Sequence, residues 1–181
     1  MMPFLVSFLL IQAVLFGVEL TPWAQTYFVL PWTNGIAAVS AWLVTVFDPN
    51  VTAMGKVLRS TANGFAVSIE PGCNGIEACI VLVSAVLAFP APWRSKLLGL
   101  CAGVVAVQGL NIVRVISLFY IGQWNMQAFE WAHLYVWQAL IMLDVLIVWL
   151  VWVRTLPREN RGRTPRPPDA SGRADAAIAA T

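Results

Sequence analysis

Long apolar runs limit what this chain can fold into more than any other feature. Runs with at most one charge each occupy residues 4–20, 76–89, 97–120 and 134–153. A helix needs about 20 apolar residues to cross the hydrocarbon core of a bilayer, within a range near 17–25. Of the 181 residues, 59% are hydrophobic and 11% are charged, whereas soluble domains carry roughly 25% charged residues. These values exclude a soluble globular domain and a largely disordered chain, and they predict an all-α integral membrane protein.

The number of spans depends on residues 35–47. This segment is uncharged but short, and it follows a stretch rich in proline and aromatic residues, 21–34, that is typical of the membrane–water interface. Residues 35–47 therefore form either a fifth span or an interfacial helix, and we favour the interfacial helix. The sequence thus predicts a bundle of four or five transmembrane helices.

A polar segment, residues 48–72, separates the early apolar runs from the later ones. Within it, apolar and small or polar residues alternate over 65–70, which predicts a β-strand. Asn63-Gly64 supplies a hairpin turn before this strand, and Val57-Leu58 begins the partner strand. Pro71-Gly72 ends the hairpin. We therefore expect a short β-hairpin outside the membrane.

Positive charges orient the predicted helices. Arg94 and Lys96 lie in a short loop, and several arginines follow the last run directly. Because short cytoplasmic loops are enriched in basic residues, both segments are predicted to be cytoplasmic, and the hairpin and the connection at 121–133 then lie on the opposite side. The chain divides into a membrane domain, residues 1–153, and a basic tail, residues 154–181, predicted to be disordered and cytoplasmic. The net positive charge resides in this tail and does not indicate nucleic-acid binding.

Cys73 differs from the other two cysteines. It stands in Pro-Gly-Cys-Asn-Gly, directly before the apolar run at 76–89 and on the predicted outer side. Flanking glycines let a substrate approach closely, and a helix N-terminus stabilises a thiolate. Cys79 and Cys101 lie inside apolar runs and are expected to be small core residues. Cys73 is therefore either a nucleophile or an unreactive loop cysteine, and a lone outer thiol without a purpose would be a liability.

The run at 97–120 carries a polar stripe. Four residues recur every third position and share roughly one helical face: Gln108, Asn111, Arg114 and Ser117. Arg114 lies near the predicted outer end, where the positive-inside rule does not place a basic residue. It is therefore either a snorkelling side chain or part of a shared polar pocket.

His133 is the only histidine, and it precedes the last apolar run at the same outer side. If that helix extends backward, Glu130 lies one turn before His133 and would orient its imidazole; Glu77 is the other acid considered for this role. An interfacial histidine among aromatic residues is the alternative interpretation.

Together, Cys73, Arg114 and His133 predict acyl transfer. His133 would take the thiol proton, Cys73 would attack a peptide carbonyl, and Arg114 would hold the oxyanion or bind the substrate. Asn74 and Asn111 are expected to support these three residues. The chain offers no set of metal ligands, and no cofactor is expected. Two alternatives remain open: a non-catalytic membrane scaffold, and a small transporter subunit in which the polar stripe and Asp144 line a path.

Three motifs resemble the exosortase/archaeosortase family of membrane transpeptidases: Pro-Gly-Cys-Asn-Gly-Ile-Glu-Ala at 71–78, Asn-Ile-Val-Arg-Val at 111–115, and Ala-His-Leu-Tyr at 132–135. The family's Cys, Arg and His fall on Cys73, Arg114 and His133, and the resemblance covers about residues 4–153. Segments 64–67, 89–94 and 121–125 are similar to the exosortase H subgroup, which the Asn-Gly after Cys73 also fits.

This resemblance implies a cysteine protease or transpeptidase that recognises a C-terminal sorting signal. Such a signal combines a short motif of the Ile-Pro-Thr-Leu type, a transmembrane helix and a basic cluster. The enzyme would cut at the motif through a Cys thioester and transfer the new C-terminus to an envelope acceptor. The implied location is the bacterial inner membrane, with the active site at the extracytoplasmic face. The implied partners are the lipid bilayer and membrane-anchored protein substrates, without nucleic acid.

Overall fold

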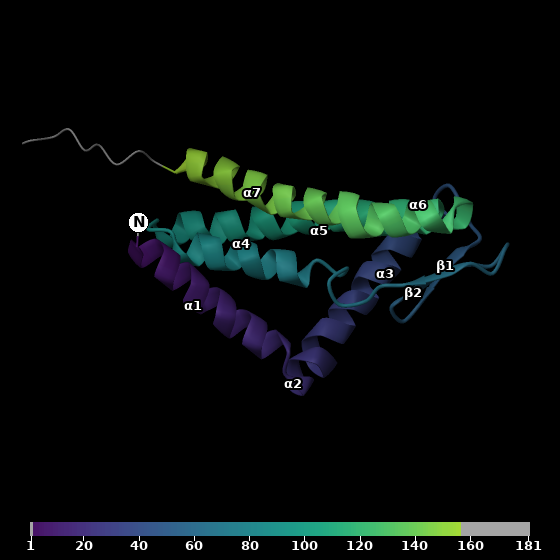
Figure 1. The fold of residues 1–181 in the computed structure, drawn as a ribbon, viewed down its shortest axis with the longest axis horizontal. Helices are drawn as coiled ribbons and strands as arrows, with labels where there is room; N and C mark the ends of the chain where they lie inside the picture. The colour runs from purple at the N-terminus through teal and green to yellow at the C-terminus, as the bar shows by residue number, and fades with distance from the viewer. Residues whose placement is uncertain (1, 157–181) are drawn as a thin grey trace, which may run out of the picture.

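A computed structural model describes residues 2–156, which form a helical bundle with a small β-sheet at one end (Figure 1). Four helical segments are long and apolar enough to cross a membrane: Met2–Glu19, Pro22–Thr45, Trp93–Trp124 and Met126–Thr155. A shorter apolar helix, α4, spans Ile76–Ala88. The prediction of an all-α integral membrane protein is confirmed. The predicted disordered tail begins at residue 154, but Arg154 and Thr155 still belong to the last helix; from position 157 onward the tail lies outside the described residues.

Helices α4, α5 (Trp93–Trp124) and α7 (Trp137–Thr155) pack against one another, and α1 (Met2–Glu19) packs on α4. Figure 1 shows α5 and α7 running together along the molecule, with α4 beside the half nearer the N-terminus. Gly99 of α5 allows close packing, because a Cβ there would lie 2.2 Å from Nε1 of Trp152 on α7. The core of this half comprises Ala78, Leu82, Val86, Val107, Ile141, Val145 and Trp152.

The segment after α1 is one continuous helical rod. It consists of α2 (Pro22–Ala24), the π-helical η1 (Gln25–Val29) and α3 (Leu30–Thr45). Oγ1 of Thr21 caps the start by accepting a hydrogen bond from the Ala24 N–H at 3.3 Å. Pro22 lies in the first turn, where its missing N–H costs nothing, and the wider π turn precedes Pro31. The prediction that this helix starts at residue 35 was wrong, because both prolines occupy positions that a helix tolerates.

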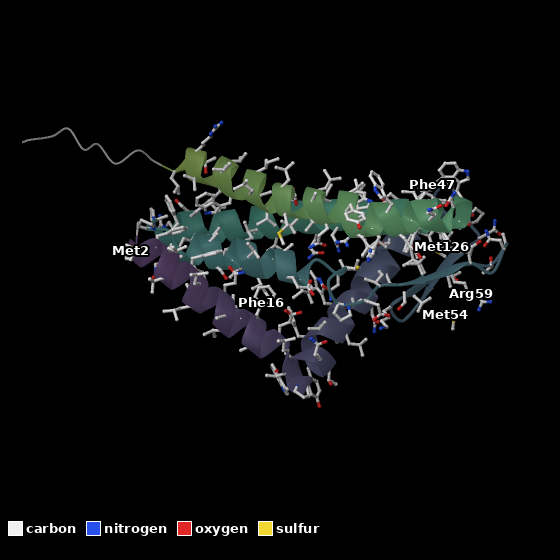
Figure 2. All side chains as sticks on the ribbon, in the orientation of Figure 1. Met2, Phe16, Phe47, Met54, Arg59 and Met126 are labelled. Atoms are coloured by element: carbon white, nitrogen blue, oxygen red, sulfur yellow. The ribbon has the colours of Figure 1, made fainter. Side chains whose placement is uncertain are left out.

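Helix α3 leads away from the end at which α1 begins. Figure 1 shows α1 and α3 meeting at α2, with α3 continuing toward the sheet. In Figure 2, Met2 marks one end of the molecule, and Met54 and Arg59 of the sheet mark the other. Helix α3 packs on the sheet strands and on α5. The rod therefore lies beside the sheet half of the bundle and does not return to the Met2 end.

The last helical rod begins earlier than the sequence predicted. It consists of α6 (Met126–Trp131), the π-helical η2 (Ala132–Val136) and α7. Only Asn125 separates this rod from α5, with φ −156° and ψ 117°. Oδ1 of Asn125 accepts a hydrogen bond from the Ala128 N–H at 3.0 Å and so caps the new helix. The prediction of a non-helical connection over 121–133 was wrong, since one capping residue is enough to turn the chain.

The predicted hairpin is present, with one strand more than expected. Strands β1 (Val51–Met54), β2 (Val57–Ser60) and β3 (Ala66–Ser68) form an antiparallel sheet in the order β1-β2-β3. Gly55 has φ +59° and closes the β1–β2 turn; this glycine is the sequence signal for the missed strand. The buried residues of the sheet join α3 and α5 in a second core: Ile36, Ala37, Val44, Val51, Leu58, Ile69, Val115 and Phe119.

Candidate active site

A tight turn carries the chain from β3 to Cys73. The Cys73 N–H donates to the Glu70 carbonyl oxygen at 2.9 Å, and Gly72 has φ +86°. Proline at the second position and a left-handed glycine at the third are the features of a type II turn. Pro71-Gly72 therefore ends the hairpin as predicted and places Cys73 just before α4.

Asn74 anchors this turn to α3. Its side chain is fully buried: Oδ1 accepts from the Ile76 N–H at 3.0 Å, and Nδ2 donates to Oγ1 of Thr33 at 3.1 Å. Nε1 of Trp32 donates to the Asn74 carbonyl oxygen at 3.4 Å. Thr33 and Trp32 were not identified from the sequence, since they lie about forty residues away and no local motif marks them.

Gly75 makes room for the polar stripe of α5. It has φ +75°, and a Cβ there would lie 2.7 Å from Nε2 of Gln108 and 3.1 Å from Cγ of Asn111. A non-glycine residue in this conformation also costs about 1–3 kcal/mol. The loop and α5 are therefore in close contact, and the contact depends on the missing side chain.

We expect Gly75→Ala to lower the free energy of unfolding by at least about 1–3 kcal/mol. The control is Gly109→Ala on α5, whose Cβ would meet nothing within 4 Å and whose effect should be neutral or stabilising, because alanine favours a helix by about 1 kcal/mol. Thermal unfolding of the purified protein in detergent measures both effects. Equal midpoints for the two variants would contradict the close contact.

Arg114 points into the site. Gln108, Asn111 and Arg114 are all buried, and Arg114 is only 2% exposed, so the predicted polar stripe faces inward. Nη1 of Arg114 donates to the Gly72 carbonyl oxygen at 3.4 Å, and Nη2 lies 3.6 Å from Sγ of Cys73. Within residues 2–156 the one salt bridge joins Lys56 and Glu70. The guanidinium is therefore buried beside the thiol without a carboxylate partner, and so it is free to stabilise another anion.

His133 completes the group. Its Nε2 lies 3.7 Å and its Nδ1 3.9 Å from Sγ of Cys73, so either nitrogen can receive the thiol proton after a small adjustment. The imidazole stacks on Phe129, with ring centroids 5.7 Å apart and an interplanar angle of 2°. His133 lies in the π-helical η2, and single π turns occur frequently at functional sites. The three residues that the sequence predicted to converge do so.

The two predicted orienting acids lie elsewhere. Glu130 is exposed, and among the described residues it makes no hydrogen bond with His133. Oε1 of Glu77 accepts from the Gly72 N–H at 2.5 Å, so Glu77 braces the turn instead of the imidazole. Phe129, one turn before His133, holds the imidazole ring by stacking. The sequence pattern instead indicated the neighbouring Glu130 for this orienting role.

The site lies about one bilayer thickness from the basic ends of the helices. Arg94 and Arg114 are 20 residues apart on α5, and His133 and Arg154 are 21 apart on the last rod. At 1.5 Å per residue each separation is roughly 30 Å, which matches the hydrocarbon thickness of roughly 30 Å. If Arg94 and Arg154 mark one membrane surface, Cys73 lies at the other surface.

Two opposing effects set the acidity of Cys73. Burial raises the pKa of the thiol above its ordinary value, and the Arg114 guanidinium acts against this shift. Glu77 and Glu70 add smaller contributions that also raise the pKa. A buried thiol of this kind needs both the adjacent cation and a nearby base to react as a thiolate.

Arg114→Gln should move the pH midpoint for alkylation of Cys73 upward, because the variant loses the charge that lowers the thiol pKa. For each unit of increase, the thiolate fraction at neutral pH falls about tenfold. The measurement is iodoacetamide labelling against pH in a Cys79→Ser/Cys101→Ser background, in which Cys73 is the only cysteine. The exposed Arg94→Gln is the control and should leave the midpoint in place. An unchanged or lower midpoint in Arg114→Gln would argue against the electrostatic role.

Comparison with known proteins identifies the family. A family profile described as transmembrane exosortase matches residues 4–153, which include nearly the full length of the apolar helices and the site around Cys73. A comparison with curated proteins and one with solved structures each returned no match. The match covers most of the chain, and it agrees with the membrane-embedded fold. The chain therefore belongs to the transmembrane exosortase family.

Proposed function

We propose that this protein is a membrane cysteine transpeptidase that cleaves a C-terminal sorting signal and transfers the new C-terminus to an acceptor. The observation that carries the proposal is the placement of Cys73 within 3.6–3.7 Å of both Arg114 Nη2 and His133 Nε2. Membership of the exosortase family supports the assignment of these residues to acyl transfer. The geometry favours this function over a transporter subunit, because Asp144 makes no hydrogen bond with the polar stripe in the described part of the chain.

In the acylation half-reaction, His133 accepts the proton of the Cys73 thiol and the thiolate attacks the scissile carbonyl carbon. The carbonyl oxygen becomes an oxyanion, which the Arg114 guanidinium stabilises. The carbon–nitrogen bond then breaks, and His133 returns its proton to the departing amine. The product is a thioester between Cys73 and the new C-terminus, together with the released transmembrane segment.

In the second half-reaction, an acceptor nucleophile attacks the thioester carbonyl. His133 accepts the proton of that nucleophile, the carbon–sulfur bond breaks, and the proton passes to the Cys73 thiolate. An amine or hydroxyl acceptor gives transfer, whereas water gives hydrolysis. The Arg114 guanidinium stabilises the oxyanion of this step as well, since both steps pass through the same carbonyl oxygen position.

We place the protein in the bacterial inner membrane, with Arg94, Lys96 and the tail from Arg154 in the cytoplasm. Cys73 then faces the extracytoplasmic side, and so does the sheet half of the bundle, beside which α3 lies. The substrate signal is of the Ile-Pro-Thr-Leu type with a transmembrane helix and a basic cluster. Such a substrate is anchored in the same bilayer and reaches the site by lateral diffusion.

The test is co-expression of this protein with a reporter that ends in such a sorting signal. We expect a shortened reporter in cells that contain the protein and none in cells that lack it. Added hydroxylamine should trap the thioester as a hydroxamate, and the mass of the untrapped product distinguishes transfer from hydrolysis. A reporter that stays intact while Cys73 reacts with iodoacetamide would contradict the proposed substrate and favour a scaffold.

A further inference from the structure

Strand β3 has one edge that no other strand occupies. The sheet order is β1-β2-β3, so β2 covers only one side of β3. The Ser60 N–H donates to the Phe65 carbonyl oxygen at 2.8 Å, and the Ile69 N–H donates to the Lys56 carbonyl oxygen at 2.9 Å. These two bonds show that the odd-numbered residues of this strand direct their backbone groups toward β2.

The intervening residues therefore direct their backbone groups outward. Ala66 and Ser68 stand opposite Arg59 and Val57 in the register, at the positions where an antiparallel pair exchanges no backbone hydrogen bonds. Both residues are exposed, and no backbone N–H or C=O of either is bonded to another described residue outside the ladder. Two donors and two acceptors thus line the open edge, which we call the β3 edge.

Proteins usually protect such an edge with proline, lysine or a bulge, because it pairs readily with another extended chain. Strand β3 is short, with three residues, but it contains no proline or lysine and its register with β2 is regular. Glu70 follows the strand, but its carboxylate is already occupied by two side chains of the same segment. It accepts hydrogen bonds from Lys56 Nζ at 2.5 Å and from Ser68 Oγ at 2.6 Å. The β3 edge is thus open, as is the outer edge of β1, but only the β3 edge continues directly into the turn that carries Cys73.

The β3 edge leads directly to Cys73. The turn from Glu70 to Cys73 is closed by a backbone hydrogen bond, so its ends lie within roughly 7 Å of each other. Ser68 is two extended residues before Glu70, which adds roughly 7 Å. A strand paired with Ser68 therefore needs about four extended residues to bring a peptide carbonyl to Sγ of Cys73.

We propose that the β3 edge binds the extended segment of the substrate that carries the scissile bond. The segment adds to the sheet as a fourth strand through the backbone groups of Ala66 and Ser68, and its onward course delivers the carbonyl to Cys73. This mode of recognition requires an extended stretch with a backbone N–H at each paired position, and backbone hydrogen bonds supply the affinity. The proline of an Ile-Pro-Thr-Leu-type motif then lies outside the positions paired with Ala66 and Ser68. The inference rests on the proposed transpeptidase function, which supplies the occupant of the edge.

The first experiment removes a single outward N–H. Ser68→Pro deletes the N–H that faces the open edge and leaves the ladder to β2 intact, since proline is tolerated on an edge strand whose N–H faces outward. Ser68→Ala is the matched control, because it loses the same side chain and keeps the N–H. We expect Ser68→Pro to lower kcat/KM for the reporter by about two- to tenfold relative to Ser68→Ala, the range for one lost hydrogen bond. Thermal unfolding of both variants shows that the fold is retained.

The second experiment does not depend on turnover. A photo-crosslinking amino acid replaces Ala66 in a Cys73→Ala background, with the same amino acid in place of Thr52 on the far strand β1 as control. Irradiation with the sorting-signal reporter should join position 66, but not position 52, to the extended segment of the reporter. Mass spectrometry of the crosslinked peptide identifies the segment.

The outcomes separate the two proposals. The binding role of the β3 edge is overturned if the wild type cleaves the reporter but position 66 gives no crosslink. It is also overturned if Ser68→Pro and Ser68→Ala cleave at equal rates. In both cases the transpeptidase function still stands. A specific crosslink without cleavage by the wild type supports the edge and contradicts the catalytic function. If the wild type does not cleave the reporter and position 66 does not crosslink to it, both proposals are overturned.

Discussion

Cys73→Ser is expected to abolish processing of the sorting-signal reporter, with a fall in rate of at least roughly a thousandfold. Loss of a catalytic nucleophile has effects of this size or larger. Serine preserves the shape of the side chain, but its hydroxyl ionises far less readily than a thiol, and the Arg114–His133 pair is arranged around sulfur at 3.6–3.7 Å. The measurement is the initial rate of reporter shortening at equal protein levels in the membrane.

Cys79→Ser is the matched control for this prediction. Cys79 lies on α4 and its Sγ accepts a hydrogen bond from Nε2 of Gln108 at 3.3 Å, an interaction that a serine hydroxyl can also make. We expect this variant to keep most of the wild-type rate. Processing by Cys73→Ser at a rate near that of Cys79→Ser would exclude Cys73 as the nucleophile.

His133→Gln should lower the rate by about 10²–10⁴, which is the usual contribution of a general acid–base residue. Glutamine keeps a polar group near Sγ but does not accept the thiol proton. In the wild type, the rate should rise with pH as His133 loses its proton, because only the neutral imidazole acts as the base. In the variant this rise should disappear, and the remaining activity should increase only at the higher pH at which the buried thiol ionises by itself.

Tyr135→Phe is the control for the histidine variant, since Tyr135 lies in the same π-helical segment and is exposed. Its rate and pH profile should match those of the wild type. A His133→Gln protein with an unchanged pH profile would show that another group takes the thiol proton. Unfolding midpoints of the two variants in detergent verify that the loss is catalytic.

Much of this molecule could be predicted from the sequence because the strongest signals are local. Apolar runs predicted α1, α4, α5 and α7, although α4 is shorter than the four segments able to cross a membrane, and the rod over Pro22–Thr45 was predicted only in part. Asn63-Gly64 with the alternation that follows predicted the β2–β3 hairpin. Helical periodicity placed Gln108, Asn111 and Arg114 on one face, and counting helices placed that face near Cys73 and His133. The errors arose where proline and asparagine allow a helix to continue or restart, at Pro22, Pro31 and Asn125.

The sequence by itself determined which residues share a helical face and which segments are apolar enough to enter the membrane, except around residues 35–47. It did so because hydrophobicity and the 3.6-residue period depend only on local order. Only the tertiary structure decided that Sγ of Cys73 lies within 4 Å of both Arg114 and His133. A slip of one residue along α5 would move Arg114 by 1.5 Å and rotate it by about 100°. The packing of Gly75 on the polar stripe, the bond between Asn74 and Thr33, and the stacking of His133 on Phe129 set that register, and all three join residues brought together by the fold.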